Sequence, residues 1–199
     1  MKPVSKKDLE EIYVRIEKNQ INTKDNKELN KIITFGDFSV INYNQKRVKF
    51  PTLKVEELFA LLIMNKDSGV GKWNLINELW DISEIKNPLQ NLYTTIYRLR
   101  KTFEKYNLPF KIRKANDNYK INIENTFFDY HQFKKSFENL KDSTITEKNI
   151  SNFKRLVDLY VGNLFMYKDY IWCIYERNAL QNNYSLILKK LKNFYESNN

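Results

Sequence analysis

The 199-residue sequence predicts an α+β fold, in which a small antiparallel sheet, three helices and a β-hairpin are followed by an all-α segment. Between residues 31 and 123 the apolar residues change from the spacing of strands to that of helices and back, whereas helical spacing dominates after Phe128. The apolar content of 42% is enough to form a core. No apolar run reaches the roughly 18 residues that a membrane span needs, so we expect no membrane association.

The first thirty residues predict a helix and a linker. Ser5 and Asp8 have the spacing of a capping box, and Leu9, Ile12 and Ile16 form one apolar stripe, which favours a helix over residues 5–18. Residues 19–30 contain few apolar side chains and many turn formers. We therefore expect a linker there.

Residues 31–123 follow the order sheet, three helices, hairpin. Short β-rich runs in residues 31–50 are interrupted at Gly36-Asp37 and at residues 42–45. Asn87 and Pro88 are typical of a helix start, as cap and first-turn residue. This order within about 90 residues is typical of a winged helix-turn-helix. Its predicted elements after the sheet are helices at 53–66, 73–82 and 87–106, a turn at 67–72, and hairpin strands at 110–114 and 119–123.

The remaining residues, 124–199, predict an all-α segment. Apolar stripes favour helices at 129–141, 146–161 and 172–195. Paired helices of this length suit a helical-repeat domain, although the sequence shows no internal repeat. We expect Trp172 and Tyr175 to anchor this segment against the hairpin-bearing part.

The net charge of +10 is unevenly distributed. Residues 31–123 hold sixteen Lys or Arg against nine Asp or Glu, and residues 98–120 hold eight against two. A uniform basic bias can follow from the base composition of a genome. A localised basic patch instead indicates an anionic partner.

The third helix has two different faces. In NLYTTIYRLRK (91–101), Leu92, Ile96 and Leu99 form the stripe that a core requires. The other side carries hydroxyls, an amide and cations without an acid, and a helix of this kind fits the major groove of B-DNA. The residues that we assign to this side are Asn91, Thr94, Thr95, Arg98 and Lys101.

These side chains have distinct predicted roles. Arg98 can bind O6 and N7 of guanine, and Thr94 can offer its methyl or hydroxyl group to a base edge. Asn91 and Thr95 can reach phosphate or base, whereas Arg100 and Lys101 suit phosphate. On the hairpin, Arg113 and Lys114 would flank the minor groove, where a narrow A·T tract attracts cations.

The sequence contains few residues that could support catalysis. His131 and Cys173 are single residues of their kinds, which argues against a zinc site or a Cys/His nucleophile. Gly69-Val70-Gly71-Lys72 resembles a phosphate-binding loop only faintly, because Trp73 stands where Ser or Thr is needed. We therefore predict no enzyme activity, cofactor, metal or small-molecule substrate. A single Cys fits a reducing, cytoplasmic setting.

Several segments resemble known regulators. KIITFGDFSV, KVEELFALLIMNKDSGVGKWNLINELW, LYTTIYRLRKTF and IRKANDNYKI together resemble the OmpR/PhoB-type winged-helix DNA-binding domain over residues 31–123. FDYHQF, LVDLYVGNLF, Trp172 and Glu176-Arg177 resemble the opening of the bacterial transcriptional activator domain of SARP-type regulators. Lys2-Pro3 and the helix after them resemble the end of a response-regulator receiver domain.

The resemblance implies an interior fragment of a two-component or SARP-like transcription regulator. Its parts would be a residual receiver helix (1–18), a linker (19–30), a winged helix (31–123) and a partial activator domain (124–199). In that family the positions of Thr94 and Arg98 face bases, and those of Asn91, Thr95 and Arg100 lie near the DNA backbone. The loop 81–86 stands where the class contacts RNA polymerase or flanking DNA. A homodimer on repeated half-sites is expected, because one such helix covers few base pairs.

One departure from the family concerns the hairpin turn. The family usually has Gly before the hairpin Tyr, whereas Asn116-Asp117-Asn118 precedes Tyr119 here. Asn and Asp tolerate positive φ better than other residues with side chains, so we expect the turn to be kept.

Two other functions fit the same sequence. The first is a winged-helix protein–protein adaptor without sequence-specific DNA binding. The second is an RNA-binding domain, although no pair of aromatic residues suited to stacking on bases is evident.

Overall fold

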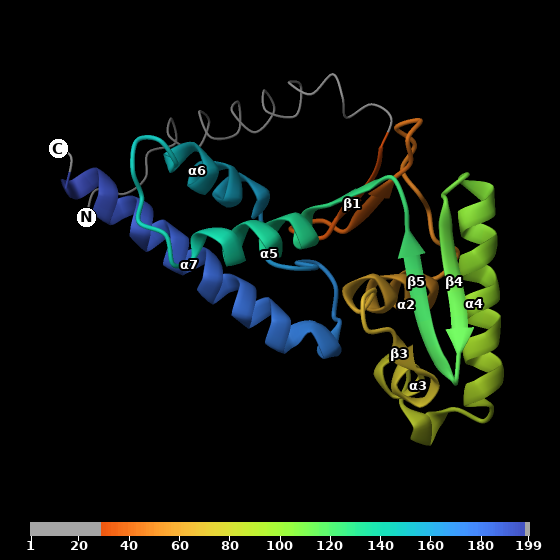
Figure 1. Cartoon of the computed structure of the whole chain (residues 1–199). Coiled ribbons are helices and arrows are strands. Elements are labelled where there is room, and N and C mark those ends of the chain that lie inside the picture. Colours follow the sequence, from red (N-terminus) through yellow and green to blue (C-terminus); the bar gives the residue numbers. More distant parts are fainter. Residues whose placement is uncertain (1–28, 198–199) are drawn as a thin grey trace.

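The computed structural model describes residues 29–197, which form two three-stranded sheets and six α-helices (Figure 1). The helix expected at 5–18 lies outside the described residues, as does most of the linker expected at 19–30. Asn30, the last residue of that linker, is already the first residue of strand β1.

Three helices form the centre of the N-terminal half, where the sequence predicts them. They are α2 (Leu53–Met64), α3 (Lys72–Leu79) and α4 (Pro88–Lys105). The Thr52 side chain caps α2 by accepting a hydrogen bond from the Val55 N–H. Asn87 precedes α4, but its side chain makes no capping hydrogen bond, contrary to expectation. Pro88 does occupy the first turn of α4.

The predicted hairpin is present as β4 (Phe110–Ala115) and β5 (Asn118–Ile123). Asn116 and Asp117 form its two-residue turn with φ values of 48° and 61°, and this confirms that the turn survives without Gly. A short strand, β3 (Val70–Gly71), lies inside the segment predicted as a turn. It pairs antiparallel with β5, so the sheet has the order β3-β5-β4.

The first sheet differs from the one that the sequence predicts. Strands β1 (Asn30–Ile33) and β2 (Ser39–Ile41) are antiparallel, but β1 also pairs in parallel with β6 (Thr126–Phe128). Residues 124–199 are therefore not all-α, and the sheet is mixed. A three-residue strand has no periodicity of its own, and its partner is distant in sequence, so local pattern does not reveal it.

The C-terminal half contains α5 (Asp129–Leu140), α6 (Ile150–Leu159) and α7 (Ile174–Ser197), which lie together in Figure 1. A 3₁₀ turn (Ile171–Cys173) leads into α7. Helix α6 begins four residues later than predicted. The delay has a local cause, because the Asn149 carboxamide oxygen accepts a 2.8 Å hydrogen bond from the Thr146 N–H and holds a turn there.

Backbone hydrogen bonds join the two halves directly. The loop after α6 lies along the β1–β2 turn, where the Phe165 N–H donates to Thr34 O (2.8 Å) and the Gly36 N–H to Asn163 O (3.0 Å). Gly162 permits this approach, since a Cβ at that position would lie 3.1 Å from the Gly36 Cα.

Asp129 connects the halves through its side chain. Its carboxylate accepts hydrogen bonds of 2.7 Å from both the N–H and the hydroxyl of Thr34, and of 3.0 Å from the Phe35 N–H. The Tyr130 N–H donates a further bond of 2.7 Å. Burial raises the pKa of Asp129 to about 6, and the hydrogen bonds from Phe35 and Thr34 oppose that rise.

The hydrophobic core is also shared. Phe35 contacts Phe133 with a ring-centroid distance of 5.3 Å, and Phe38 contacts Phe165 at 5.0 Å. Trp172 stacks on Tyr170 at 5.4 Å, a contact within the C-terminal half, so its anchoring against the hairpin-bearing part stays a prediction. Tyr175 is 89% exposed, so the same expectation was wrong for that residue.

Candidate nucleic-acid interface

Helix α4 buries one side and exposes the other. Leu92, Ile96, Leu99 and Phe103 are buried in the core beside α2 and α3. Of the residues that the sequence assigns to the opposite side, Asn91, Arg98 and Lys101 are exposed, and Thr94 is partly exposed. The helix is therefore fixed by its apolar stripe while a polar surface remains free to contact a partner.

Thr95 does not belong to that surface. Its side chain is 7% exposed, and its hydroxyl donates a 2.7 Å hydrogen bond to Asn91 O within the helix. In a helix Thr95 lies about 60° from the centre of the Leu92–Ile96–Leu99 stripe. The contact with neighbouring elements is wide enough to include it, so the placement of Thr95 on the outer face was wrong.

Arg98 is the most available cation of α4. Its side chain is exposed and makes no hydrogen bond or ion pair within residues 29–197. The backbone carbonyl of Arg98 accepts a hydrogen bond from the Thr102 hydroxyl, and this bond does not involve the guanidinium group. Five donors in a planar fork are thus presented to solvent, a geometry suited to phosphate or to a guanine edge.

Arg100 and Lys101 are partly engaged within the protein. One guanidinium nitrogen of Arg100 donates a 3.0 Å hydrogen bond to Ile112 O and so connects α4 with β4. Lys101 forms a 2.7 Å ion pair with Glu104, which raises the pKa of Lys101. Lys101 is exposed, so this pair costs little to exchange for a phosphate.

The two hairpin cations point to opposite faces of the sheet. Lys114 shares its face with Ile112 and Phe110, lies 6.0 Å from the Tyr119 ring centre and pairs with Asp117 at 3.0 Å. Its pKa is raised chiefly by Asp117 and slightly by Tyr93 of α4, which places it on the α4 side. Arg113 alternates with Lys114 and faces away from α4. The structure therefore does not bring this predicted pair together on one surface.

Two tyrosines on the same surface were not predicted as site residues. Tyr93 and Tyr97 are 42% and 60% exposed, and the Lys101 ammonium lies 5.8 Å from the centre of the Tyr97 ring. The helical wheel places Tyr97 about 40° from Lys101 and about 60° from Thr94. This position on the wheel could have identified Tyr97 as a surface residue from the sequence. The interface thus offers apolar rings beside its hydroxyls and cations.

The loop between α3 and α4 contains a 3₁₀ turn, Ile82–Glu84. The Asp81 carboxylate caps it, accepting hydrogen bonds from the hydroxyl (2.6 Å) and N–H (2.9 Å) of Ser83. These two bonds lower the pKa of Asp81. Ile82 is exposed. The loop at 81–86 is therefore a formed surface feature, and contact with polymerase or flanking DNA stays a prediction.

Cys173 and the loop at residues 69–72, which the sequence analysis considered for catalysis, make contacts within the fold. Cys173 is buried, and its thiol donates to Tyr170 O at 3.1 Å; burial raises the pKa of this thiol. Gly71 belongs to β3, and Lys72 pairs with Asp117. Within residues 29–197 no group of three or more His, Cys, Asp or Glu could hold a metal ion. No helix in that range is long and apolar enough to cross a membrane.

Comparison with known proteins identifies a similar fold. No protein-family model and no curated protein matches the chain. Among solved structures, the chain is similar to Mycobacterium tuberculosis EmbR in complex with a low affinity phosphopeptide, with a TM-score of 0.56 and 15% sequence identity. The match covers 81% of this chain and 42% of the EmbR chain. At this identity the similarity is one of fold.

Proposed function

We propose that this chain is a DNA-binding transcriptional regulator that inserts α4 into the major groove and reads sequence there. The observation that supports this proposal most directly is the exposed, unpaired guanidinium of Arg98, which lies beside Thr94 on a helix whose other face is buried in the core. The protein binds and does not catalyse. It acts in the cytoplasm, as part of a regulator of the two-component or SARP-like type.

Charge and fold similarity support this proposal. Residues 98–120, which span the last eight residues of α4 and most of the hairpin, carry eight Lys or Arg against two Asp or Glu. Cations at this density favour a polyanion, and phosphate contacts dominate affinity for DNA. The fold resembles that of EmbR, a transcriptional regulator of the SARP family. The sequence resemblance to winged-helix and activator domains points to the same class.

The roles of individual side chains follow from their placement. Arg98 and Thr94 read base edges, and Tyr97 beside them can contact thymine methyl groups. Asn91 and Lys101 bind phosphate and fix the register of the helix. Lys114 extends the same surface onto the hairpin. A homodimer on two half-sites supplies the selectivity that one helix lacks. RNA polymerase is the further partner that a regulator of this type engages.

Three single substitutions on α4 test this function. A selected high-affinity duplex and a scrambled duplex are titrated with each variant at several salt concentrations. Arg98→Ala should lower the preference for the selected site about tenfold. Lys101→Ala should weaken binding to both duplexes by the same factor. It should also reduce by about one the slope of the logarithm of the binding constant against the logarithm of the salt concentration. Thr95→Val is the matched control, because this buried residue should leave DNA affinity unchanged.

Opposite results would reject the assignment of the reading face. Wild-type affinity and preference in both Arg98→Ala and Lys101→Ala would show that α4 does not read DNA. A loss of preference in Thr95→Val equal to that in Arg98→Ala would show that the substitutions act through folding.

A protein–protein adaptor is the second candidate. Several large apolar side chains around the loop between α6 and α7 are exposed, which suits a protein partner. An adaptor would bind all duplexes with the same weak, salt-sensitive affinity and retain protein partners after nuclease treatment. The exposed residues are Val161, Met166, Tyr167, Ile171 and Tyr175.

A further inference from the structure

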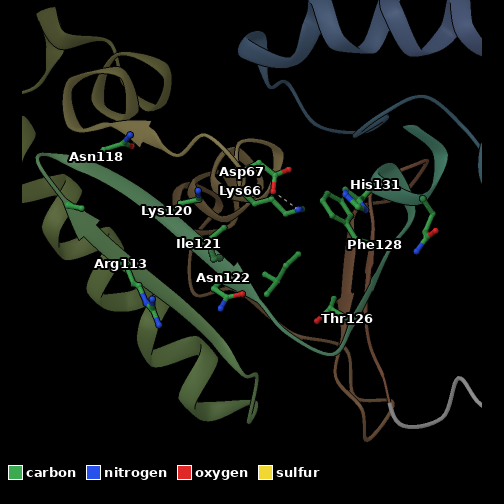
Figure 2. Close-up of a pocket in the computed structure, with 13 residues that line it drawn as sticks. Lys66, Asp67, Arg113, Asn118, Lys120, Ile121, Asn122, Thr126, Phe128 and His131 are labelled. Atoms are coloured by element: carbon green, nitrogen blue, oxygen red, sulfur yellow. Dashed lines mark hydrogen bonds and ion pairs between the residues drawn. The ribbon is translucent and has the colours of Figure 1, made fainter. Parts of the chain in front are cut away.

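A groove of about 720 Å³ lies between the hairpin and the start of α5. Figure 2 shows its lining side chains, which come from the α2–β3 turn, from β4 and β5, and from β6 and α5. The groove is therefore built by both halves of the chain. Its polar and charged lining residues are Lys66, Asp67, Arg113, Asn118, Lys120, Asn122, Thr126, His131 and Gln132.

Positive groups from the α2–β3 turn, β4 and β5 line this groove. The Lys66 ammonium forms a 2.8 Å ion pair with Asp67. This hydrogen bond, together with smaller effects of His131 and Lys120, lowers the pKa of Asp67. Lys120 and Arg113 have exposed side chains on neighbouring strands and form a cross-strand pair. Asp67 is the one acidic residue that lines the groove, so the described lining carries a positive excess that suits an anion.

The groove is separate from the surface that α4 presents. Arg113 and Lys120 line the groove from the exposed face of the hairpin, and Ile121 lines it from the opposite, buried face. No residue of α4 lines the groove. A duplex bound along α4 would not occupy this space, and a groove enclosed by the α2–β3 turn, the hairpin, β6 and α5 favours a small molecule over a DNA backbone.

The groove also has an apolar wall. Ile121, Ile123 and Phe128 line it together with the amides of Asn118, Asn122 and Gln132. Ligand sites commonly have volumes of roughly 300–1,000 Å³, form at domain interfaces, and combine apolar walls with a few polar groups. The cations can bind phosphate oxygens while the apolar wall receives the rest of the ligand.

We propose that this groove is a binding site for a small organic phosphate of nucleotide size, held by Lys66, Arg113 and Lys120 and bridging the hairpin to α5. The proposal does not depend on DNA binding by α4. A ligand that contacts both halves at once gives the molecule a site through which an effector can act.

Calorimetric titration of the whole chain with three probes tests the proposal. Adenosine diphosphate should bind with one site per chain and more tightly than pyrophosphate, because only the former can use the apolar wall. Adenosine, which lacks phosphate, should not bind measurably. Lys120→Ala should lower the affinity for adenosine diphosphate about tenfold, as expected for the loss of a charge-assisted hydrogen bond.

Lys111→Ala is the matched control. Lys111 has the same charge and lies on the same face of the hairpin, but it does not line the groove. Its substitution should leave the affinity within about twofold. Arg98→Ala should also retain adenosine diphosphate binding, which separates this site from the proposed DNA surface.

Several outcomes would overturn the proposal. These are no binding of adenosine diphosphate at millimolar concentration, equal affinity for adenosine diphosphate and pyrophosphate, or equal losses in Lys120→Ala and Lys111→Ala. Displacement of the nucleotide by duplex DNA, with DNA affinity reduced in Lys120→Ala, would instead assign the groove to a DNA backbone.

Discussion

Among single residues, Asp129 combines burial with the largest number of hydrogen bonds at the junction of the halves. Its two oxygens accept from Thr34, Phe35 and Tyr130. A carboxylate in this position orients both β1 and the first turn of α5. Burial nevertheless disfavours its charge more than the hydrogen bonds favour it, and so its pKa is about 6.

Asp129→Asn should change how stability depends on pH. Because the folded pKa of about 6 exceeds the ordinary aspartate value of 3.8, the folded protein binds more protons than the unfolded chain between these values. The free energy of unfolding of the wild type, relative to Asp129→Asn, should therefore fall as pH rises from 4 to 6, by about 3 kcal/mol at most. Denaturant titrations at pH 4, 5, 6 and 7 measure this difference.

Asp81→Asn provides a comparison of opposite sign. Hydrogen bonds from Ser83 lower the pKa of exposed Asp81, so its ionised form is favoured by folding and that contribution is lost as pH falls. A difference between wild type and Asp129→Asn that stays constant or increases from pH 4 to pH 6 would contradict the role given to Asp129.

Among the elements, β3 depends on a glycine. Gly69 has a φ of +75°, and a Cβ there would lie 2.7 Å from the Asn118 carboxamide oxygen and 3.0 Å from Tyr119 O. The short strand can approach β5 only because this side chain is missing. Both the backbone conformation and the contact therefore require glycine at this position.

Gly69→Ala should reduce the free energy of unfolding by about 2 kcal/mol or more, from left-handed backbone strain and steric overlap together. Gly71→Ala is the matched control two residues away. Its φ is −62°, and a Cβ would meet nothing closer than 3.9 Å. Thermal and denaturant unfolding of both variants measures the difference, and equal stabilities would contradict the proposed packing of β3.

Across the whole molecule, the sheet and the aromatic core join the two halves. β6 pairs with β1, Phe35 packs against Phe133, and the loop after α6 bonds to the β1–β2 turn. Unfolding of either half would break these contacts and expose core side chains of the other. The described part of the chain should therefore unfold as one cooperative unit.

Tryptophan fluorescence can test this cooperativity. Trp73 and Trp80 lie in the N-terminal half and Trp172 in the C-terminal half. Trp172→Phe leaves probes of the first half, and Trp73→Phe with Trp80→Phe leaves a probe of the second. Each variant should show one midpoint that coincides with its own far-ultraviolet circular dichroism transition. Two separated midpoints would show that the halves unfold independently.

The sequence alone determined the features that depend on local pattern. The apolar stripe of α4, the Asn116-Asp117 turn and the order of helices and hairpin follow from side-chain periodicity and backbone preference, which neighbouring residues already specify. It also indicated Arg98 as an available cation. In each case the physical cause acts over a few residues, so the pattern is readable without the rest of the chain.

The tertiary structure decided what depends on distant partners. The parallel pairing of β6 with β1 joins segments about a hundred residues apart. Thr95 is buried because its neighbours cover a wider face of α4 than the stripe requires, and Arg113 is separated from Lys114 by the sheet. The groove exists only where α5 meets the hairpin. These features arise from packing between elements, which the order of residues along one element does not specify.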